Sequence, residues 1–290
     1  MENILRPIYQ ERASNPSTSG ILLIEKRTHL ELDTNTFDYI LLVITNEYSK
    51  EQFVKHYQYE DNKIALYIIS INLLKEWILL SSNRKVFDWL YYGKIIFDRN
   101  DFLHNLITEI KDFPFHERKL KIGIEYAKLI KRYTEGKKLY EGQQYMDAYS
   151  YIVHALHHLG RLALIEKGIH PEIALWNQVK QIEPEIVKLY EELVNSHEPL
   201  KKRLELLFLA SDFFIHSRAN IGAAHLIEIL NEKENWSIQE IIEQEELKLY
   251  SIDIYTFLEF LVEKAIIKID LIETKGKSVH HRYYRVVDGV

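Results

Sequence analysis

The sequence predicts an α+β protein in three parts: a mixed α/β region, an all-helical middle and a carboxyl-terminal helix-turn-helix with a β-hairpin. Short apolar runs alternate with amphipathic stretches up to about residue 113, and purely helical spacing follows from 116 to 230. Two helices and two β-branched segments end the chain. With 290 residues, the chain exceeds the ~100 to 200 residues of one domain. We place the domains at 1–115, 116–230 and 231–290.

Composition excludes several classes of function. The chain has no cysteine, so disulfides, thiolate metal sites and cysteine nucleophiles are excluded. The first seven residues lack a basic region followed by a long apolar run, so we expect no secretory signal and a cytoplasmic protein. The most apolar later segment, Ile64 to Leu80, is interrupted by Asn72, Lys75 and Glu76. It is too polar for a membrane span, and we expect no membrane role.

The first domain is expected to contain a mixed sheet covered by helices. Its continuous apolar runs are too short for buried helices and predict strands at 20–25, 37–45, 63–70 and 93–97. Amphipathic spacing predicts helices at 4–13, 50–59, 73–80 and 101–111.

The sequence of the middle domain predicts helices that are separated by glycine and proline residues. We interpret as helix starts and stops the residues Gly136, Gly168, Pro171, Pro184 and Pro199. The most distinctive helix is 143–167, whose Ala148, Ile152, Ala155, Leu159, Leu162 and Ala163 share one side. His154, His158 and Arg161 lie on a separate stripe, with His157 beside it.

The last sixty residues have the outline of a winged helix. After a polar linker at 231–235, helices are expected at 237–244 and 251–263, with Ser251 as N-cap and Asp253 in the first turn. Strands at 266–272 and 281–287 should form a hairpin around Lys275-Gly276-Lys277.

One segment of the first domain resembles a known enzyme superfamily. Phe37-Asp38-Tyr39-Ile40-Leu41-Leu42-Val43-Ile44 lines up with the polymerase-beta-like nucleotidyltransferases, where an Asp-x-Asp opens a strand about eleven residues after a Gly-Ser pair. The following strand, helix and closing strand at 64–70, 73–80 and 92–99 fit the same order. With its helical middle and winged helix, the whole chain resembles the YgxA-like nucleotidyltransferase-like family.

The resemblance implies chemistry for which most residues are missing. The superfamily holds two divalent ions, normally Mg²⁺, on three carboxylates. Asp38 keeps the first position, Ile40 occupies the second, and the strand 64–69 contains no acid. Lys26 and Arg27 stand at the Gly-Ser position. We therefore expect no metal site and a catalytically degenerate protein, in which Asp38 caps the sheet edge. Glu25, Glu31 and Asp33 could approach Asp38 in an active form, but their spacing places no two of them on one metal.

Two groups of cations are candidate ligand-binding residues. Lys26 and Arg27 lie where the parent fold receives a triphosphate, and both side chains suit phosphate oxygens. The second group is His154, His158 and Arg161, because the resemblance implies that a helix of the middle domain walls the cleft. A nucleotide or phosphorylated ligand is therefore expected between the first two domains. His154 and His158 are spaced for zinc, but Ala155 stands where a metalloprotease needs glutamate.

Charge patterns bear on nucleic-acid binding. Residues 118–138 carry eight Lys and Arg against two Glu, or +6, and could meet phosphates, although such runs are usually solvated. From 231 to 263 two Lys oppose nine acids, or −7, whereas 264–287 carry six cations against two acids, or +4. Repulsion along the second helix predicts no sequence-specific DNA binding, and a module that packs on the chain or on a partner protein.

Three hypotheses about function follow. The chain is a degenerate nucleotidyltransferase that binds a phosphorylated ligand, an active Mg²⁺-dependent enzyme acting on a small hydroxyl compound around Asp38, or a regulatory scaffold acting through protein partners.

Overall fold

The computed structural model describes residues 2–26, 34, 36–47, 51–80, 83, 85–112, 115–172, 174–250, 253–276 and 278–287. The chain forms two compact units, residues 1–114 and 115–290. None of the helices within the described ranges is long and apolar enough to cross a bilayer.

The first unit is built on a five-stranded sheet in the order β3-β4-β2-β1-β5. Its strands are β1 (Thr18–Glu25), β2 (Tyr39–Thr45), β3 (Phe53–Tyr59), β4 (Asn62–Ser70) and β5 (Lys94–Asp98). The central strands β2 and β4 run parallel, with Tyr39 opposite Ile64 and Thr45 opposite Ser70. The other neighbours pair antiparallel. The sheet is therefore mixed, as the sequence predicts.

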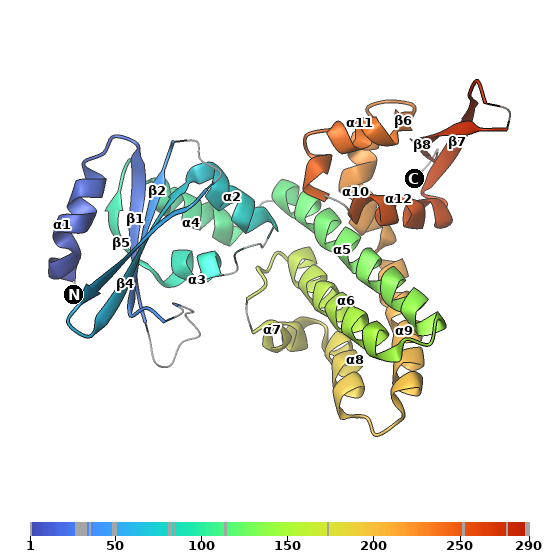
Figure 1. Cartoon of the computed structure of the whole chain (residues 1–290), viewed down its shortest axis with the longest axis horizontal. Coiled ribbons are helices and arrows are strands. Elements are labelled where there is room, and N and C mark those ends of the chain that lie inside the picture. Colours follow the sequence, from blue (N-terminus) through green and yellow to red (C-terminus); the bar gives the residue numbers. More distant parts are fainter. Residues whose placement is uncertain are drawn as a thin grey trace. The chain divides into compact units, whose positions relative to one another are not determined.

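Helices cover both faces of this sheet (Figure 1). Helix α1 (Glu2–Ala13) inserts Leu5 into one core, against Ile21, Leu41 and Leu66. Helices α2 (Ile71–Leu80), α3 (Lys85–Tyr92) and α4 (Phe102–Asp112) cover the other face. Alternate residues of β2 therefore enter opposite cores, which explains the continuous apolar run.

Two elements of this unit differ from the expectation. The helix predicted at 50–59 is wrong, because 53–59 form the edge strand β3. Phe53, Val54 and Tyr57 fit a helical spacing, but these residues also favour strands. Seven residue pairs with the antiparallel strand β4 supply backbone hydrogen bonds to the segment, and a turn at Glu60, with φ 50°, connects the two strands. Helix α3 was not predicted, although its four buried residues follow a helical spacing: Val86, Phe87, Trp89 and Leu90.

The second unit begins with six helices. These are α5 (Phe115–Glu141), α6 (Tyr145–Glu166), α7 (Leu175–Ile182), α8 (Pro184–Asn195), α9 (Leu200–Ser217) and α10 (Ala219–Leu230). Gly136 does not end a helix as expected but lies inside α5. A Cβ there would be 3.0 Å from Tyr151 Cβ, so glycine lets α6 approach α5 closely. Pro184 does begin a helix, at the start of α8.

The chain ends in a winged helix. It comprises β6 (Trp236–Ser237), α11 (Ile238–Glu243), the 3₁₀ turn η1 (Leu247–Tyr250), α12 (Asp253–Glu263), β7 (Ile267–Glu273) and β8 (His280–Val286). Ser237 and Glu240 form a capping box at α11. Strand β6 and η1 were not predicted, while Ser251 and Lys277 lie outside the described residues.

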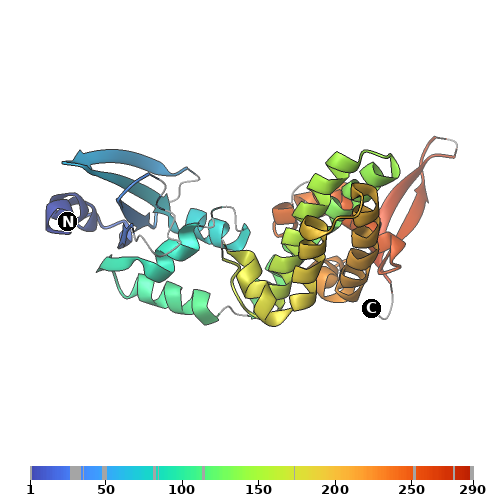
Figure 2. The same ribbon diagram turned by 90° about the horizontal axis from the view of Figure 1, so that it is seen from below.

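This module packs on the helices of its own unit. The ring of Tyr126 on α5 lies 5.7 Å from that of Phe257 and 6.1 Å from that of Phe260, both on α12. Lys131 Nζ lies 3.1 Å from Asp253 Oδ1. The β7–β8 hairpin projects away from α10 and α12 (Figures 1 and 2).

Candidate functional site

Asp38 lies just before β2 and joins three strands. Its Oδ2 accepts a hydrogen bond from the Lys63 backbone N–H at 2.9 Å. The Asp38 N–H donates to the Lys63 carbonyl, and the Lys26 N–H donates to the Asp38 carbonyl, both at 2.8 Å. The carboxylate is therefore engaged in holding β4 beside β2.

The two other carboxylate positions of the parent fold are occupied by apolar residues. Ile40 is 0% exposed and lies in the core under α2, α3 and α4. On β4, the residues Ile64, Ala65 and Leu66 are equally buried. An acid at these positions would replace core packing and carry an unpaired charge into it.

The described residues around Asp38 do not fit a pair of Mg²⁺ ions. Throughout the described ranges, no three His, Asp or Glu side chains are grouped so that they could hold a metal. Glu25 is exposed at the end of β1, and Glu31 and Asp33 lie outside the described residues. Lys26 is exposed directly after β1, and Arg27 also lies outside the described residues.

The second group of candidate residues meets a buried acid. His158 Nδ1 on α6 lies 2.7 Å from Glu125 Oε2 on α5. Arg161 Nη1 lies 3.7 Å from the same oxygen, and Lys128 Nζ lies 3.9 Å from Glu125 Oε1. The side chain of Glu125 is 2% exposed, whereas those of His158 and Arg161 are 14% and 11% exposed. The side chains of His158 and Arg161 are thus held at the edge of the core rather than solvated.

Burial and hydrogen bonding act against each other at this contact. Burial raises the pKa of Glu125, but the His158 hydrogen bond and the charges of His158, Lys128 and Arg161 outweigh it and hold the pKa at about 2. Burial lowers the pKa of His158, and Arg161 and Lys128 add to that effect, against the raising effect of Glu125. A neutral His158 donating Nδ1–H to an ionised Glu125 satisfies both groups.

A larger positive stripe surrounds this contact. We define the α5–α6 seam as the side chains Arg118, Lys121, Glu125, Lys128 and Arg132 of α5 with His154, His158 and Arg161 of α6. At about 100° per residue, each set falls on one side of its helix, and the Glu125–His158 contact joins the two. The seam contains five Arg and Lys against one carboxylate, and of these five Lys121 is buried. It therefore favours anions.

Three of the four remaining cations of the 118–138 run, Lys119, Lys131 and Lys137, have structural partners. Lys119 Nζ lies 2.8 Å from Glu228 Oε2 on α10, and Lys131 pairs with Asp253. Lys137 lies over the ring of Tyr133. The run is thus divided between the seam and the contacts of α5 with the rest of its unit.

The four histidine and arginine positions of α6 have different surroundings. His154 is exposed. The ring of His157 lies 5.1 Å from that of Trp176 and 5.8 Å from that of Tyr190. Those two rings stack at 4.6 Å. His157 therefore belongs to an aromatic cluster of α6, α7 and α8, while His158 and Arg161 belong to the seam.

Glu125 was not recognised from the sequence. In the sequence it is one of two acids within the basic run 118–138. The available signal was its spacing from Ile122 and Leu129, which are both buried. A glutamate on an apolar stripe predicts a buried partner on the helix that covers it.

Comparisons with known proteins agree with this architecture. The chain matches family models for a nucleotidyltransferase-like domain at residues 1–118, a YgxA-like substrate binding domain at 119–218 and a helix-turn-helix domain at 224–286. It is 49% identical to the uncharacterized protein YgxA of Bacillus subtilis (strain 168), over 100% of this chain and 99% of that protein. A crystal structure of a nucleotidyltransferase-like protein from Exiguobacterium sibiricum 255-15 is 37% identical, with a TM-score of 0.86 and 99% of each chain covered.

Proposed function

The chain belongs to the YgxA-like family of nucleotidyltransferase-like proteins, and from this premise we propose that it binds a nucleotide or another phosphorylated ligand without performing metal-dependent nucleotidyl transfer. The observation that carries the proposal is the burial of Ile40, at 0% exposure, where the fold needs its second carboxylate. Nucleotidyl transfer with two metal ions requires several carboxylates that line one cleft. Asp38 alone supplies one, and its Oδ2 already accepts the Lys63 N–H.

Ligand binding is supported by the α5–α6 seam. This positive stripe belongs to the domain that matches a substrate-binding model. Arg161 offers a planar fork for two phosphate oxygens, and Lys128 adds a nearby charge. Glu125 holds His158 and Arg161 in place, so the cations are oriented before a ligand arrives.

The test combines catalysis and binding on the full chain. Pyrophosphate release is measured with nucleoside triphosphates and Mg²⁺, and none is expected. Calorimetric titration with the same nucleotides is then run with Mg²⁺ and with a chelator. Binding through cations should survive the chelator, whereas metal-dependent pyrophosphate release above background would overturn the proposal.

Single substitutions locate the ligand. Lys128→Ala removes a seam cation, Lys138→Ala removes an exposed lysine on another side of the same helix, and Lys26→Ala tests the end of β1. We expect about a tenfold loss of affinity for Lys128→Ala, equivalent to the ~1.4 kcal/mol of one good contact, and no loss for Lys138→Ala. If all three variants bind the ligand with wild-type affinity, neither the seam nor Lys26 belongs to the binding site.

A further inference from the structure

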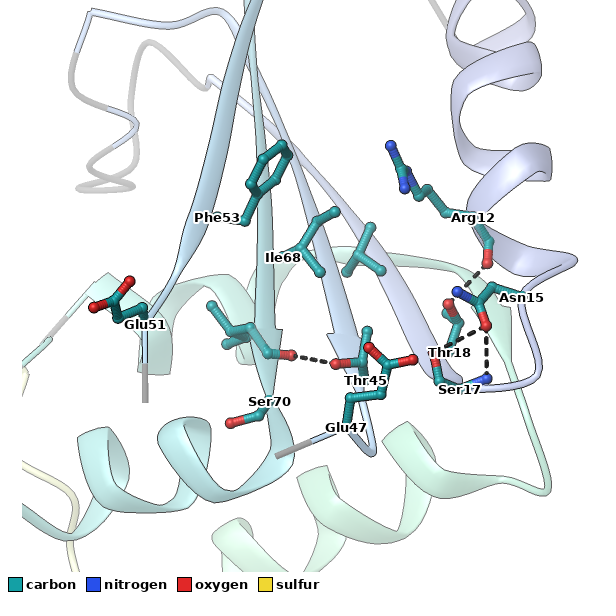
Figure 3. Close-up of a pocket in the computed structure, with 12 residues that line it drawn as sticks. Arg12, Asn15, Ser17, Thr18, Thr45, Glu47, Glu51, Phe53, Ile68 and Ser70 are labelled. Atoms are coloured by element: carbon teal, nitrogen blue, oxygen red, sulfur yellow. Dashed lines mark hydrogen bonds between the residues drawn. The ribbon is translucent and has the colours of Figure 1, made fainter. Parts of the chain in front are cut away.

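A pocket lies at the opposite end of β2 from Asp38. It has a volume of about 270 Å³ and opens at the carboxyl ends of the parallel strands β2 and β4 (Figure 3). The strand of seven residues places it roughly 20 Å from Asp38. The lining residues come from α1 and the turn after it, the start of β1, the ends of β2 and β4, and the start of β3.

The pocket combines an apolar wall with many polar groups. Val43, Ile68 and Phe53 form the apolar part, and Phe53 is 47% exposed. Arg12 enters from the end of α1 and Asn15 from the turn after it, Glu47 lies beside Thr45, and Glu51 lies at the other side (Figure 3). The remaining polar lining consists of hydroxyl groups: Ser17, Thr18, Thr45 and Ser70.

Hydrogen-bonding capacity is available in this lining. Arg12 Nε is buried and has no hydrogen-bond partner among the described residues. The bond from Thr45 Oγ1 to Ile69 O is long, at 3.4 Å, so this hydroxyl loses little when it turns to a ligand. Asn15 Oδ1 accepts from Ser17 N and Oγ at 3.0 and 2.9 Å. These bonds fix the amide, whose NH₂ group can donate.

We infer that this pocket binds a neutral polyhydroxylated small molecule of monosaccharide size. Each hydroxyl of such a ligand both donates and accepts, which matches a lining that holds one guanidinium, an amide, two carboxylates and the hydroxyls of Ser17 and Thr45. The hydroxyls of Thr18 and Ser70 are already bonded to Arg12 O and Leu73 N. The C–H face of a sugar ring packs on Phe53 and Ile68. The volume lies just below the ~300 to 1,000 Å³ of drug-sized sites.

Charge disfavours two alternatives, a phosphate ester and a cationic amine. A phosphate ester would meet the carboxylates of Glu47 and Glu51, and a cationic amine would meet the guanidinium of Arg12. The pocket lies at the other end of β2 from the candidate catalytic position and within the first unit. The inference therefore stands independently of the proposed phosphorylated ligand.

The experiment is ligand-observed saturation-transfer NMR on the full chain. Probes at millimolar concentration are neutral monosaccharides and polyols, the corresponding sugar phosphates, and amino acids. Phe53→Ala removes the aromatic wall, and Tyr92→Ala removes an equally exposed aromatic residue, also 47% exposed, outside the pocket. Glu47→Gln is a second variant that leaves the apolar wall intact. Thermal unfolding of each variant confirms that it is folded.

We expect saturation transfer to neutral monosaccharides, with affinity lowered at least tenfold by Phe53→Ala and by Glu47→Gln and unchanged by Tyr92→Ala. Absence of transfer to every neutral probe would overturn the inference. Equal transfer in wild type, Phe53→Ala and Glu47→Gln would do the same. A clear preference for sugar phosphates or amino acids would contradict the assignment of a neutral ligand.

Discussion

The backbone of Gly222 on α10 lies directly against the ring of Tyr126 on α5, so that a Cβ at Gly222 would be 2.3 Å from two ring atoms. The Tyr126 hydroxyl donates a hydrogen bond to the Ile215 carbonyl at 2.8 Å. The same ring packs edge-on against Phe257 of α12. One tyrosine therefore joins the helical layer to the winged helix, and it depends on a glycine to do so.

Gly222→Ala is expected to destabilise the protein. The added methyl group must displace a buried ring, which costs about 1–3 kcal/mol in a packed core. Gly142→Ala is the matched control, because its Cβ would meet the Lys138 carbonyl at an ordinary 3.4 Å. Urea unfolding at 25 °C measures both variants. Equal free energies of unfolding for Gly222→Ala and wild type would show that α10 shifts without cost.

Glu125 should make stability depend on pH. Its pKa of about 2 lies below the ordinary value of 4.5, so the ionised form contributes stability that is complete above pH 4.5 and is lost as pH falls toward 2. The lowered pKa of His158 changes the stability in the same direction, because stability again falls as pH falls. Folding keeps His158 neutral, so stability also falls as pH drops below about 6.5, the pKa of histidine in an unfolded chain.

Glu125→Gln tests this contact. We expect a loss of about 1–3 kcal/mol at pH 7, since a charged hydrogen bond is replaced by a neutral one, and a shallower fall in stability below pH 4.5. The control is Glu135→Gln on the same helix, where the carboxylate lies 4.0 Å from Arg132 and reaches solvent. That change should stay within about 0.5 kcal/mol. Parallel pH curves for wild type and Glu125→Gln would contradict the expectation.

Much of this fold could be predicted from residue patterns, and the failures have physical causes. The continuous run of β2 predicts a strand covered on both faces, and Ile40 and Leu41 do enter opposite cores. The edge strand β3 was mistaken for a helix because local spacing does not reveal pairing with β4. Contacts between residues that are far apart in the sequence could not be predicted either. Neither the Glu125–His158 contact nor the pocket beside Arg12 can be predicted from spacing within one segment.

Asp38 should matter for stability rather than catalysis. Asp38→Asn keeps an oxygen that can accept the Lys63 N–H, so we expect little change in the free energy of unfolding. Asp38→Ala leaves that N–H without its acceptor and should cost about 1–3 kcal/mol. Chemical unfolding of both variants measures the difference. Pyrophosphate release that is present in wild type and abolished in a stably folded Asp38→Asn variant would instead identify a catalytic carboxylate.

The winged helix presents a poor surface to DNA. A reading helix in the major groove runs between two rows of phosphates and needs donors for base edges. Helix α12 contains no Lys or Arg, and its buried side includes Phe257 and Phe260, which contact Tyr126 of α5. Its exposed positions include Tyr255, Glu259 and Glu263.

We therefore expect the full chain to show no sequence-selective binding to duplex DNA at physiological salt. The wing adds cations, but Arg282 lies 2.6 Å from Glu259 and Arg285 lies 3.3 Å from Asp270. Contact between the wing and DNA phosphates should therefore be weak. It should be lost between 50 and 200 mM salt, roughly as for a few phosphate contacts. Titration of random and selected duplexes at both salt concentrations, followed by fluorescence anisotropy, measures this. Glu259→Gln should strengthen low-salt binding by relieving repulsion. Selective binding that survives 200 mM salt and disappears in Tyr255→Ala would instead make α12 a reading helix.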